Sequence, residues 1–328
     1  MPARTGRQYI DGLSKNPAEV WIRGEKVDDV TTHPDLRNGV RSLAALYDLQ
    51  HDPATKDEMT FVSPSSGEPV GLSFIIPRTI DDLERRRKMM TNWAWESCGM
   101  MARTPDFLNS AVAGWAGSSD YFTANRPEFK DNVLRYHEYI RENDLTLTHT
   151  LVNLQRSRNP TAFDKIEDEV ALTVMKETGA GMVVRGSRIL ATLGPISDEI
   201  AVYPTRSHLL GKDAWRQAFS FALPCATPGM RFICRESLDL GRSSFDHPLG
   251  ARFEEMERYL ATESTGARDR VRLFHLAWDV ACSAFGGRQV LYERFFGGDP
   301  VRNHMLLYQG YDKQNAMDRV QRFLEREG

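Results

Sequence analysis

The chain has 328 residues, of which 41% are hydrophobic and 27% charged, with a formal net charge of −3. This composition is typical of a globular protein and gives no electrostatic basis for binding nucleic acid or an anionic membrane. No stretch is long and apolar enough to span a bilayer, and the N-terminal segment MPARTGRQYIDGLSKNP lacks the apolar core of a secretory signal.

The cysteines indicate a reducing compartment. No pair has the Cys-x-x-Cys spacing of a zinc site, and all four are far apart in the sequence. We therefore expect no metal, mostly buried reduced thiols and a cytoplasmic location. The four are Cys98, Cys225, Cys234 and Cys282.

The segment from 1 to 145 predicts a mainly helical domain. A short strand pair is expected around Gly24 in EVWIRGEKVDDV, followed by a helix in TTHPDLRNGVRSLAALYDLQ, where apolar residues recur at helical spacing. A polar loop with Pro53, Pro64 and Gly67 comes next. A second helix begins after the cap residue Thr79 and continues to about residue 99.

Two more helices are expected in this first domain. One is PDFLNSAVAGWAGSSDYF, with Pro105 in its first turn and small residues along one face, and the other is FKDNVLRYHEYIRENDL. Small residues let a helix approach another backbone or a flat ligand closely. The basic run 85–88 follows several acidic residues, so we expect it to form the solvated face of the helix that begins after Thr79.

The segment from 146 to 256 predicts a β domain, and the segment from 257 to 328 a helical one. Short β-branched or alternating runs separated by Gly and Pro indicate strands at the spacing of a small barrel or sandwich. These runs are LTLTHTLVN, ALTVMKE, GAGMVVRGSRILATLG, EIAVYP, AFSFALPC and MRFICRES. The order of helices, β section and helices is an α+β class. It has no βαβ alternation and no Gly-x-Gly-x-x-Gly after a strand, which argues against a Rossmann dinucleotide site.

Three segments contain residues suited to chemistry: MMARTPDF with Arg103, THTLVNLQ with His149, and ILATLGP. From the residues alone, Arg103 fits a surface or helix-capping arginine as well as an inward-facing one. His149 fits a satisfied core histidine as well as a functional one. Both alternatives stay open at this point.

Several motifs resemble one known family along nearly the whole chain. They are MMARTPDF, ENDLTLTHTLVN, GMVVRGSRILATL, FALPCATPGMRFICRES, FDHPLGARFEEM and WDVACSAFGGRQVLYERFFGGDPVR. Together they are similar to the oxygenase component of two-component 4-hydroxyphenylacetate 3-monooxygenases. Composition and periodicity do not indicate this family.

The resemblance implies an acyl-CoA-dehydrogenase-like fold, with an N-terminal helical domain, a central β domain and a C-terminal helical bundle, and a homotetramer. It implies that a separate NAD(P)H-dependent flavin reductase supplies reduced FAD. This FAD reacts with O2, and the resulting C4a-hydroperoxyflavin hydroxylates a phenol next to its hydroxyl group. Such a reaction needs a dry pocket with a few placed polar groups.

The resemblance also implies the residues around the phenol. In the family an Arg, an aromatic residue four positions later and a His surround the substrate hydroxyl, and in this chain these are Arg103, Phe107 and His149. The family usually has Tyr where this chain has Phe107, so one hydroxyl donor is missing. We expect that difference to affect substrate choice or rate rather than flavin binding.

For the flavin ring, the resemblance points to Asn153, Gln155, Thr192 and Thr205. Leu154 stands where the family has proline between the first two, which is a second departure.

In FGGRQ, Arg288 and Gln289 are expected to bind the FAD diphosphate across a subunit interface, since arginine can bond two phosphate oxygens at once. The glycine pair before them also fits a simple helix C-cap.

An internal segment of the family is absent near Glu257, where two normally distant motifs are joined. Only 71 residues follow (328 − 257), fewer than a bundle of four long helices needs. An inactive or impaired remnant of the family is therefore one alternative. An acyl-CoA-dehydrogenase-like enzyme is another, although no Glu in an apolar setting offers its catalytic base.

Overall fold

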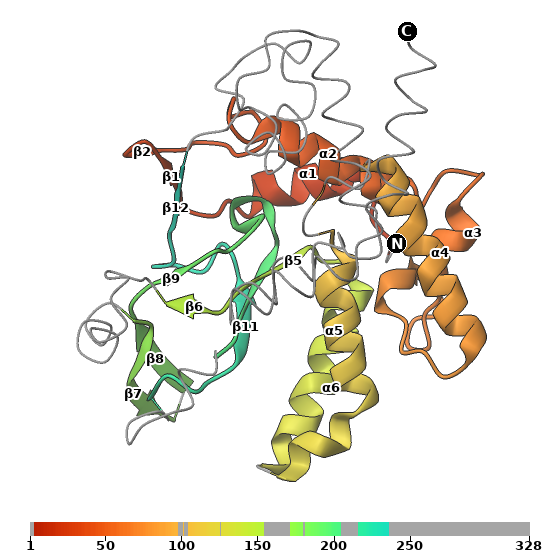
Figure 1. Cartoon of the computed structure of the whole chain (residues 1–328). Helices are drawn as coiled ribbons and strands as arrows, with labels where there is room; N and C mark the ends of the chain where they lie inside the picture. Colours follow the sequence, from red (N-terminus) through yellow and green to blue (C-terminus); the bar gives the residue numbers. More distant parts are fainter. Residues whose placement is uncertain are drawn as a thin grey trace, which may run out of the picture. The chain divides into compact units, whose positions relative to one another are not determined.

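A computed structural model describes residues 3–97, 101, 104–124, 126–153, 171–179, 181–204 and 216–235. The chain divides into two compact units, one formed by Met1–Met90 with Arg103–Arg235 and the other by Thr91–Ala102 with Glu236–Gly328. The first unit contains most of the described helices and strands (Figure 1).

Two N-terminal helices pack against each other, α1 (Gly6–Lys15) and α2 (Arg37–Asp48). Helix α1 was not predicted from the sequence, although Thr5 and Gln8 form a capping box at its N-terminus. The rings of Tyr9 and Tyr47 stack between the two helices, with centroids 5.3 Å apart. Helix α2 confirms the prediction from its apolar spacing.

A three-stranded sheet joins the two ends of this unit in the order β12-β1-β2. Strands β1 (Val20–Ile22) and β2 (Glu25–Lys26) form the predicted pair around Gly24, whose φ of 83° suits glycine. Strand β12 (Phe232–Cys234) runs parallel to β1, so the segment before residue 30 and the segment after residue 230 share one sheet.

The segment expected to be a polar loop contains regular structure. It forms α3 (Lys56–Met59), the antiparallel strands β3 (Thr60–Val62) and β4 (Pro69–Gly71), and the short helix η1 (Leu72–Phe74). The prediction was wrong because the turn residues separate two short strands instead of marking one long loop.

Helix α4 (Ile80–Glu96) begins as predicted. The hydroxyl of Thr79 accepts a hydrogen bond from the backbone N–H of Asp82, and the Asp82 carboxylate accepts one from the Thr79 N–H. The basic run within it is only partly solvated, which corrects the prediction for Arg86. That guanidinium is half-buried and donates to the backbone carbonyl of Ile75.

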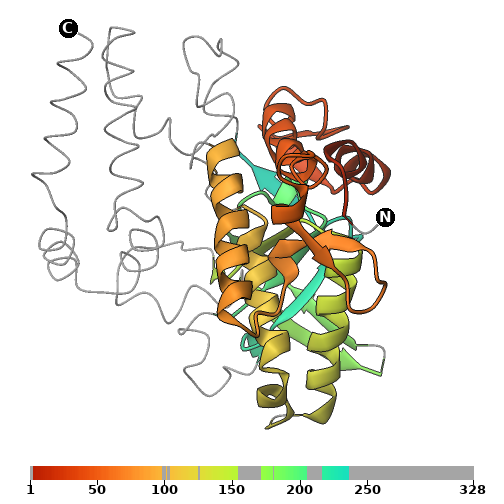
Figure 2. The ribbon, with the colours of Figure 1, turned by 90° about the vertical axis from the view of Figure 1, so that its right-hand side faces the viewer.

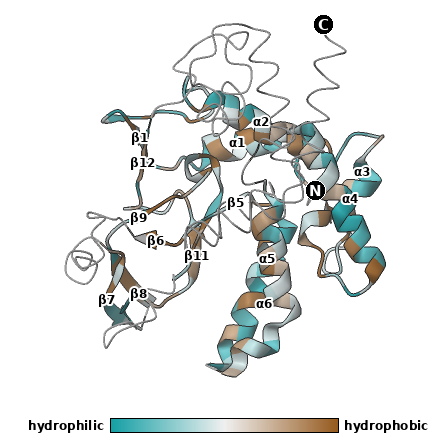
Figure 3. Ribbon diagram, viewed as in Figure 1, coloured by the Kyte–Doolittle hydropathy of each residue, from teal (hydrophilic) through white to brown (hydrophobic). Residues whose placement is uncertain are grey.

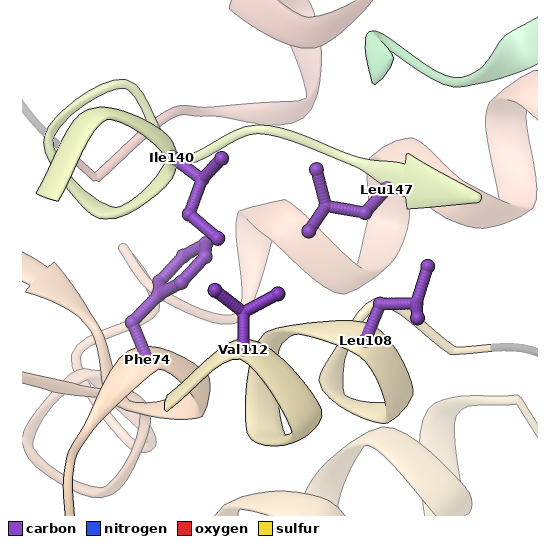
Figure 4. Packing of buried hydrophobic residues seen from close by; sticks show 5 residues of the cluster. All are labelled: Phe74, Leu108, Val112, Ile140 and Leu147. Carbon is purple, nitrogen blue, oxygen red and sulfur yellow. The ribbon is translucent and has the colours of Figure 1, made fainter. Parts of the chain in front are cut away.

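Helices α5 (Asp106–Gly117) and α6 (Pro127–Glu142) pack against each other and are joined by η2 (Ser119–Ala124) (Figures 1 and 2). Helix α6 contains both hydrophilic and hydrophobic positions, as expected for a helix with one buried face (Figure 3). Figure 4 shows the hydrophobic core formed by η1, α5, α6 and the strand that follows α6. It consists of Phe74, Leu108, Val112, Ile140 and Leu147.

The β section confirms the predicted strands that lie within the described residues. Strands β5 (Leu147–Thr150), β10 (Glu199–Val202) and β11 (Phe221–Pro224) form one sheet in the order β11-β10-β5. Strands β6 (Val152–Asn153) and β9 (Arg188–Ile189) form a second, antiparallel pair. Strands β7 (Thr173–Thr178) and β8 (Gly181–Arg185) form a hairpin.

A partly buried ionic network joins the N-terminal segment to this sheet. The Arg4 guanidinium donates to both carboxylate oxygens of Asp198, at 2.7 and 3.3 Å, and the Arg4 backbone N–H donates to Asp144 at 2.9 Å. Asp198 also accepts from the backbone N–H of Thr146 at 2.7 Å, one residue before β5 begins. The network therefore fixes the start of the strand that carries His149.

Within the described ranges, no helix is both long and apolar enough to cross a membrane. In the same part of the chain, no three His, Cys, Asp or Glu residues are grouped to hold a metal ion.

Candidate active site

Strand β5 positions His149 between two threonines that face the other way. The parallel pairing with β10 places His149 opposite Ala201. Because side chains alternate along a strand, Thr148 and Thr150 point to the opposite face from His149. The Thr150 hydroxyl donates to the Ile189 carbonyl at 2.9 Å, and the Thr148 hydroxyl donates to the Thr192 carbonyl. These polar neighbours therefore anchor the segment 189–192 instead of lining the same surface as His149.

The first turn of α5 places Phe107 beside His149. The two ring centroids lie 5.3 Å apart with the planes inclined by 35°. The Phe107 N–H donates to the Thr104 carbonyl at 3.1 Å, and the ring packs against the core cluster of Figure 4. The structure thus brings together two of the three residues expected around the phenol.

Asp106, next to Phe107, is a buried carboxyl that was not singled out from the sequence. Burial raises its pKa to about 6, against the opposing effects of a hydrogen bond from the Thr104 side chain and the charge of Arg86. Its position directly before Phe107 links the ionisation of this carboxyl to the turn that places the Phe107 ring.

Tyr203 is a second aromatic residue close to His149. The ring centroids of His149 and Tyr203 are 6.3 Å apart, and the Tyr203 N–H donates to the Thr150 carbonyl at 3.0 Å. Trp115 of α5 meets the Tyr203 ring edge-on at 5.3 Å. In the sequence Tyr203 falls at the end of a predicted strand, but no local signal pairs that strand with the one that carries His149.

Thr192 lies in a turn with unusual backbone geometry. Leu190 and Leu193 have φ values of 67° and 64°, a region that non-glycine residues rarely adopt. A Cβ on the following Gly194 would lie 2.5 Å from the ring of Phe232, so only glycine fits there. Residues in such strained backbone conformations persist only where the surrounding structure holds them in place, and they occur frequently at ligand sites.

Asn153 and Arg188 are direct backbone partners in the β6–β9 pair. Arg188, which was not predicted as a site residue, donates from its guanidinium to the Leu151 carbonyl at 3.3 Å. Partial burial lowers the Arg188 pKa to about 10, so it remains a cation at neutral pH. A half-buried arginine beside Asn153 adds positive charge where the flavin edge was predicted.

Five of the predicted site residues lie outside the described residues. They are Arg103, Gln155, Thr205, Arg288 and Gln289. For Asn153 the structure describes the backbone, which lies in β6 as predicted.

The described part of the site groups three aromatic side chains. The rings of Phe107, His149 and Tyr203 lie close together, and Thr148, on the opposite face of β5 from His149, bonds the turn that carries Thr192. Apolar rings with a few polar groups are the usual lining of a site that orients a small aromatic ligand.

Comparison with family models shows which family the chain belongs to. A model described as 4-hydroxyphenylacetate 3-hydroxylase N terminal matches residues 5–264, and the corresponding C terminal model matches residues 243–325. The chain belongs to the 4-hydroxyphenylacetate 3-hydroxylase family. The resemblance stated from its motifs is thereby confirmed.

Individual relatives are named as oxygenase components of 4-hydroxyphenylacetate 3-monooxygenase. The oxygenase component of 4-hydroxyphenylacetate 3-monooxygenase from Geobacillus sp. is 45% identical over 266 residues, which cover 80% of this chain and 53% of the relative. The chain thus spans about half the length of that relative. The crystal structure of the oxygenase component (HpaB) of 4-hydroxyphenylacetate 3-monooxygenase, complexed with FAD and 4-hydroxyphenylacetate, is 32% identical. It superposes with a TM-score of 0.73 over 99% of both chains.

A third relative contains residues that are absent from this chain. The oxygenase component from Thermus thermophilus is 31% identical over 478 aligned positions, covering 98% of both chains. The alignment is 150 positions longer than this chain (478 − 328), so at least 150 residues of the relative have no counterpart in this chain. The two family models meet within residues 243–264, which include Glu257. This agrees with the predicted junction.

Proposed function

We propose that this chain is the oxygenase component of a two-component phenol hydroxylase that uses reduced FAD and O2. The observation that carries the proposal is the contact between Phe107 and His149, 5.3 Å between ring centroids, within a chain of this family. The reaction adds a hydroxyl group to a phenol at the carbon next to its existing hydroxyl, with 4-hydroxyphenylacetate as the reference substrate. The names of the relatives support this substrate class.

The finer architecture is part of the same proposal. The chain has an acyl-CoA-dehydrogenase-like fold, with a helical domain at 1–145, a β domain at 146–256 and a shortened helical bundle at 257–328. Support comes from the mixed helices and strands of the described residues and from the superposition on the FAD-complexed relative.

The residues present fit a flavin. The partly buried Thr192, the cationic Arg188 and the strand position of Asn153 offer polar groups suited to the edge of the ring system. Thr192, Asn153, Gln155 and Thr205 would hold the ring, while Arg288 and Gln289 would hold the diphosphate. When bound, reduced FAD would supply the electrons that activate O2, and one atom of that O2 would be transferred to the phenol.

The protein contributes orientation and charge stabilisation. His149 and Arg103 bind the phenolic oxygen and favour its phenolate character, which makes the neighbouring carbon more electron-rich. The Phe107 ring holds the plane of the substrate beside His149, so that the carbon to be hydroxylated is presented in one geometry. The apolar rings keep water from the reacting atoms.

A separate NAD(P)H-dependent flavin reductase supplies the reduced FAD, and a homo-oligomer completes the flavin site across a subunit interface. The word component in the names of the relatives supports the reductase. The residues assigned to the diphosphate lie in the segment after Glu257, where the internal stretch is absent. A remnant that lacks activity is therefore the second candidate. It is favoured by the 150 positions of the Thermus alignment that have no counterpart in this chain.

The experiment that separates the two is an anaerobic titration of the purified chain with reduced FAD, followed by O2 and a panel of para-substituted phenols. Saturable FAD binding and a catechol product support the hydroxylase. Absence of FAD binding, with hydrogen peroxide as the sole oxygen product, supports the remnant.

A further inference from the structure

Two tyrosine rings pack against the core cluster that supports Phe107, and they differ in what their hydroxyl groups do. The Tyr136 hydroxyl donates to the buried Glu199 carboxylate at 3.1 Å. The Tyr203 hydroxyl makes no hydrogen bond to any described residue, although its ring is held on one side by Trp115 at 5.3 Å. Tyr203 is therefore fixed in place by its ring and free to donate from its hydroxyl.

The position of Tyr203 relates it to the phenol site. His149 is close to two aromatic rings, with centroid distances of 5.3 Å to Phe107 and 6.3 Å to Tyr203. Phe107 has no polar atom, so of these two rings only Tyr203 offers a hydrogen-bond donor beside the imidazole.

The protonation state of Tyr203 suits a donor. Burial raises its pKa above the usual value, so the hydroxyl stays protonated at neutral pH. A neutral donor in a partly desolvated site stabilises an oxygen that gains negative charge more than one in water does.

We propose that the Tyr203 hydroxyl donates a hydrogen bond to the phenolic oxygen of the substrate and so takes the place of the donor that Phe107 lacks. This assignment rests on the proposed function and adds to it a substrate-contacting residue just after the C-terminal end of β10. Tyr203 also follows a strand directly paired with the His149 strand, so the two side chains are held in a fixed relation.

The test compares two ligands that differ in the phenol group alone. The full chain, loaded with reduced FAD under anaerobic conditions, is titrated with 4-nitrophenol and with nitrobenzene. Tyr203→Phe should weaken 4-nitrophenol binding on the order of tenfold, as expected for one hydrogen bond to a partly charged oxygen, and leave nitrobenzene binding unchanged. The fraction of bound 4-nitrophenol in its coloured phenolate form should also fall.

Two further variants sharpen the result. Tyr121→Phe removes a hydroxyl from an exposed ring on η2 and should change neither ligand. Phe107→Tyr, combined with Tyr203→Phe, places a hydroxyl on the other aromatic ring next to His149 and should restore much of the 4-nitrophenol affinity.

Equal weakening of both ligands by Tyr203→Phe would assign Tyr203 a packing role and overturn the proposal, and so would no change in either. A parent chain that binds reduced FAD and forms catechol while Tyr203→Phe binds both ligands normally retains the proposed function and loses only this assignment. A parent chain that binds neither ligand overturns the Tyr203 assignment, whatever its FAD binding.

Discussion

The side-chain hydroxyl of Thr148 donates to the backbone carbonyl of Thr192, which joins the strand carrying His149 to the turn carrying Thr192. The strand with a residue assigned to the phenol is thus bonded to the turn with a residue assigned to the flavin, and the Thr150 hydroxyl adds a second bond to the Ile189 carbonyl. Their relative placement depends on a hydrogen bond between β5 and the strained turn at Leu190–Leu193.

Replacing Thr148 by valine should therefore weaken reduced-FAD binding several-fold while the chain stays folded. Valine keeps the shape and leaves the Thr192 carbonyl without its donor, at a cost of about 1–3 kcal/mol. Anaerobic titration of FAD measures the effect. Thr173→Val is the matched control, because the Thr173 hydroxyl donates to the Ala171 carbonyl at 3.0 Å in β7. Equal loss of affinity in both variants would contradict the assigned link.

Asp106→Asn should make folding less sensitive to pH between about 4 and 6. Burial raises the Asp106 pKa from 3.8 to about 6, so the folded chain binds this proton more tightly than the unfolded chain. That contribution to stability is complete below pH 4 and is lost as the pH rises through 6. The amide removes this dependence.

Urea unfolding at pH 4.5 and pH 7.5 measures the Asp106 effect. Relative to the parent, Asp106→Asn should gain on the order of 2 kcal/mol between the two values. Asp81→Asn, an exposed aspartate at the start of α4, serves as control. Parallel shifts in the two variants would show that Asp106 is not responsible.

Gly194→Ala should destabilise the turn that presents Thr192. The added Cβ would lie 2.5 Å from the Phe232 ring, and relieving such a contact costs about 1–3 kcal/mol. We expect a lower thermal midpoint and weaker FAD binding, both partly restored by Phe232→Leu. Gly114→Ala in α5, where a Cβ meets nothing within 4 Å, should be neutral or slightly stabilising. A Gly194→Ala chain that matches the parent would rule out the crowding.

Arg103→Ala should reduce hydroxylation on the order of 100-fold and alter reduced-FAD affinity little, because its assigned role is toward the phenolic oxygen. Product formation per FAD oxidised and FAD titration measure the two effects separately. Arg185→Ala, an exposed arginine on β8, controls for the loss of charge. Equal loss of FAD binding and hydroxylation would reject the role given to Arg103.

Local signals predicted much of the fold. The Thr79 cap, the turn at Gly24 and the alternating runs from β5 onward each reflect contacts within a few residues of one another, so the sequence contains the relevant information. Helix α1 was missed although its capping box was visible in Thr5 and Gln8.

The candidate site was predicted in part, and for a different reason. Phe107 and His149 came from the family resemblance, and the structure places their rings together. Tyr203 and Arg188 were missed because their proximity to the site comes from pairing between strands far apart in sequence. Partners in β10 and β5 are 52 residues apart (199 − 147), and Ile189 of β9 is 37 residues from its partner in β6 (189 − 152). The periodicity of a single segment does not indicate which strands become neighbours in a sheet.

The parallel pairing of β1 with β12 sets the order in which this unit can be completed during synthesis. Val20 pairs with Phe232, which leaves the ribosome 212 residues later (232 − 20), and Phe232 is also the ring that the Thr192 turn packs against at Gly194. The N-terminal strand must therefore wait, with one edge unpaired, while almost the whole unit is translated. A nascent chain released shortly before residue 232 would expose that edge and lack the support of the flavin turn, making it a substrate for chaperones.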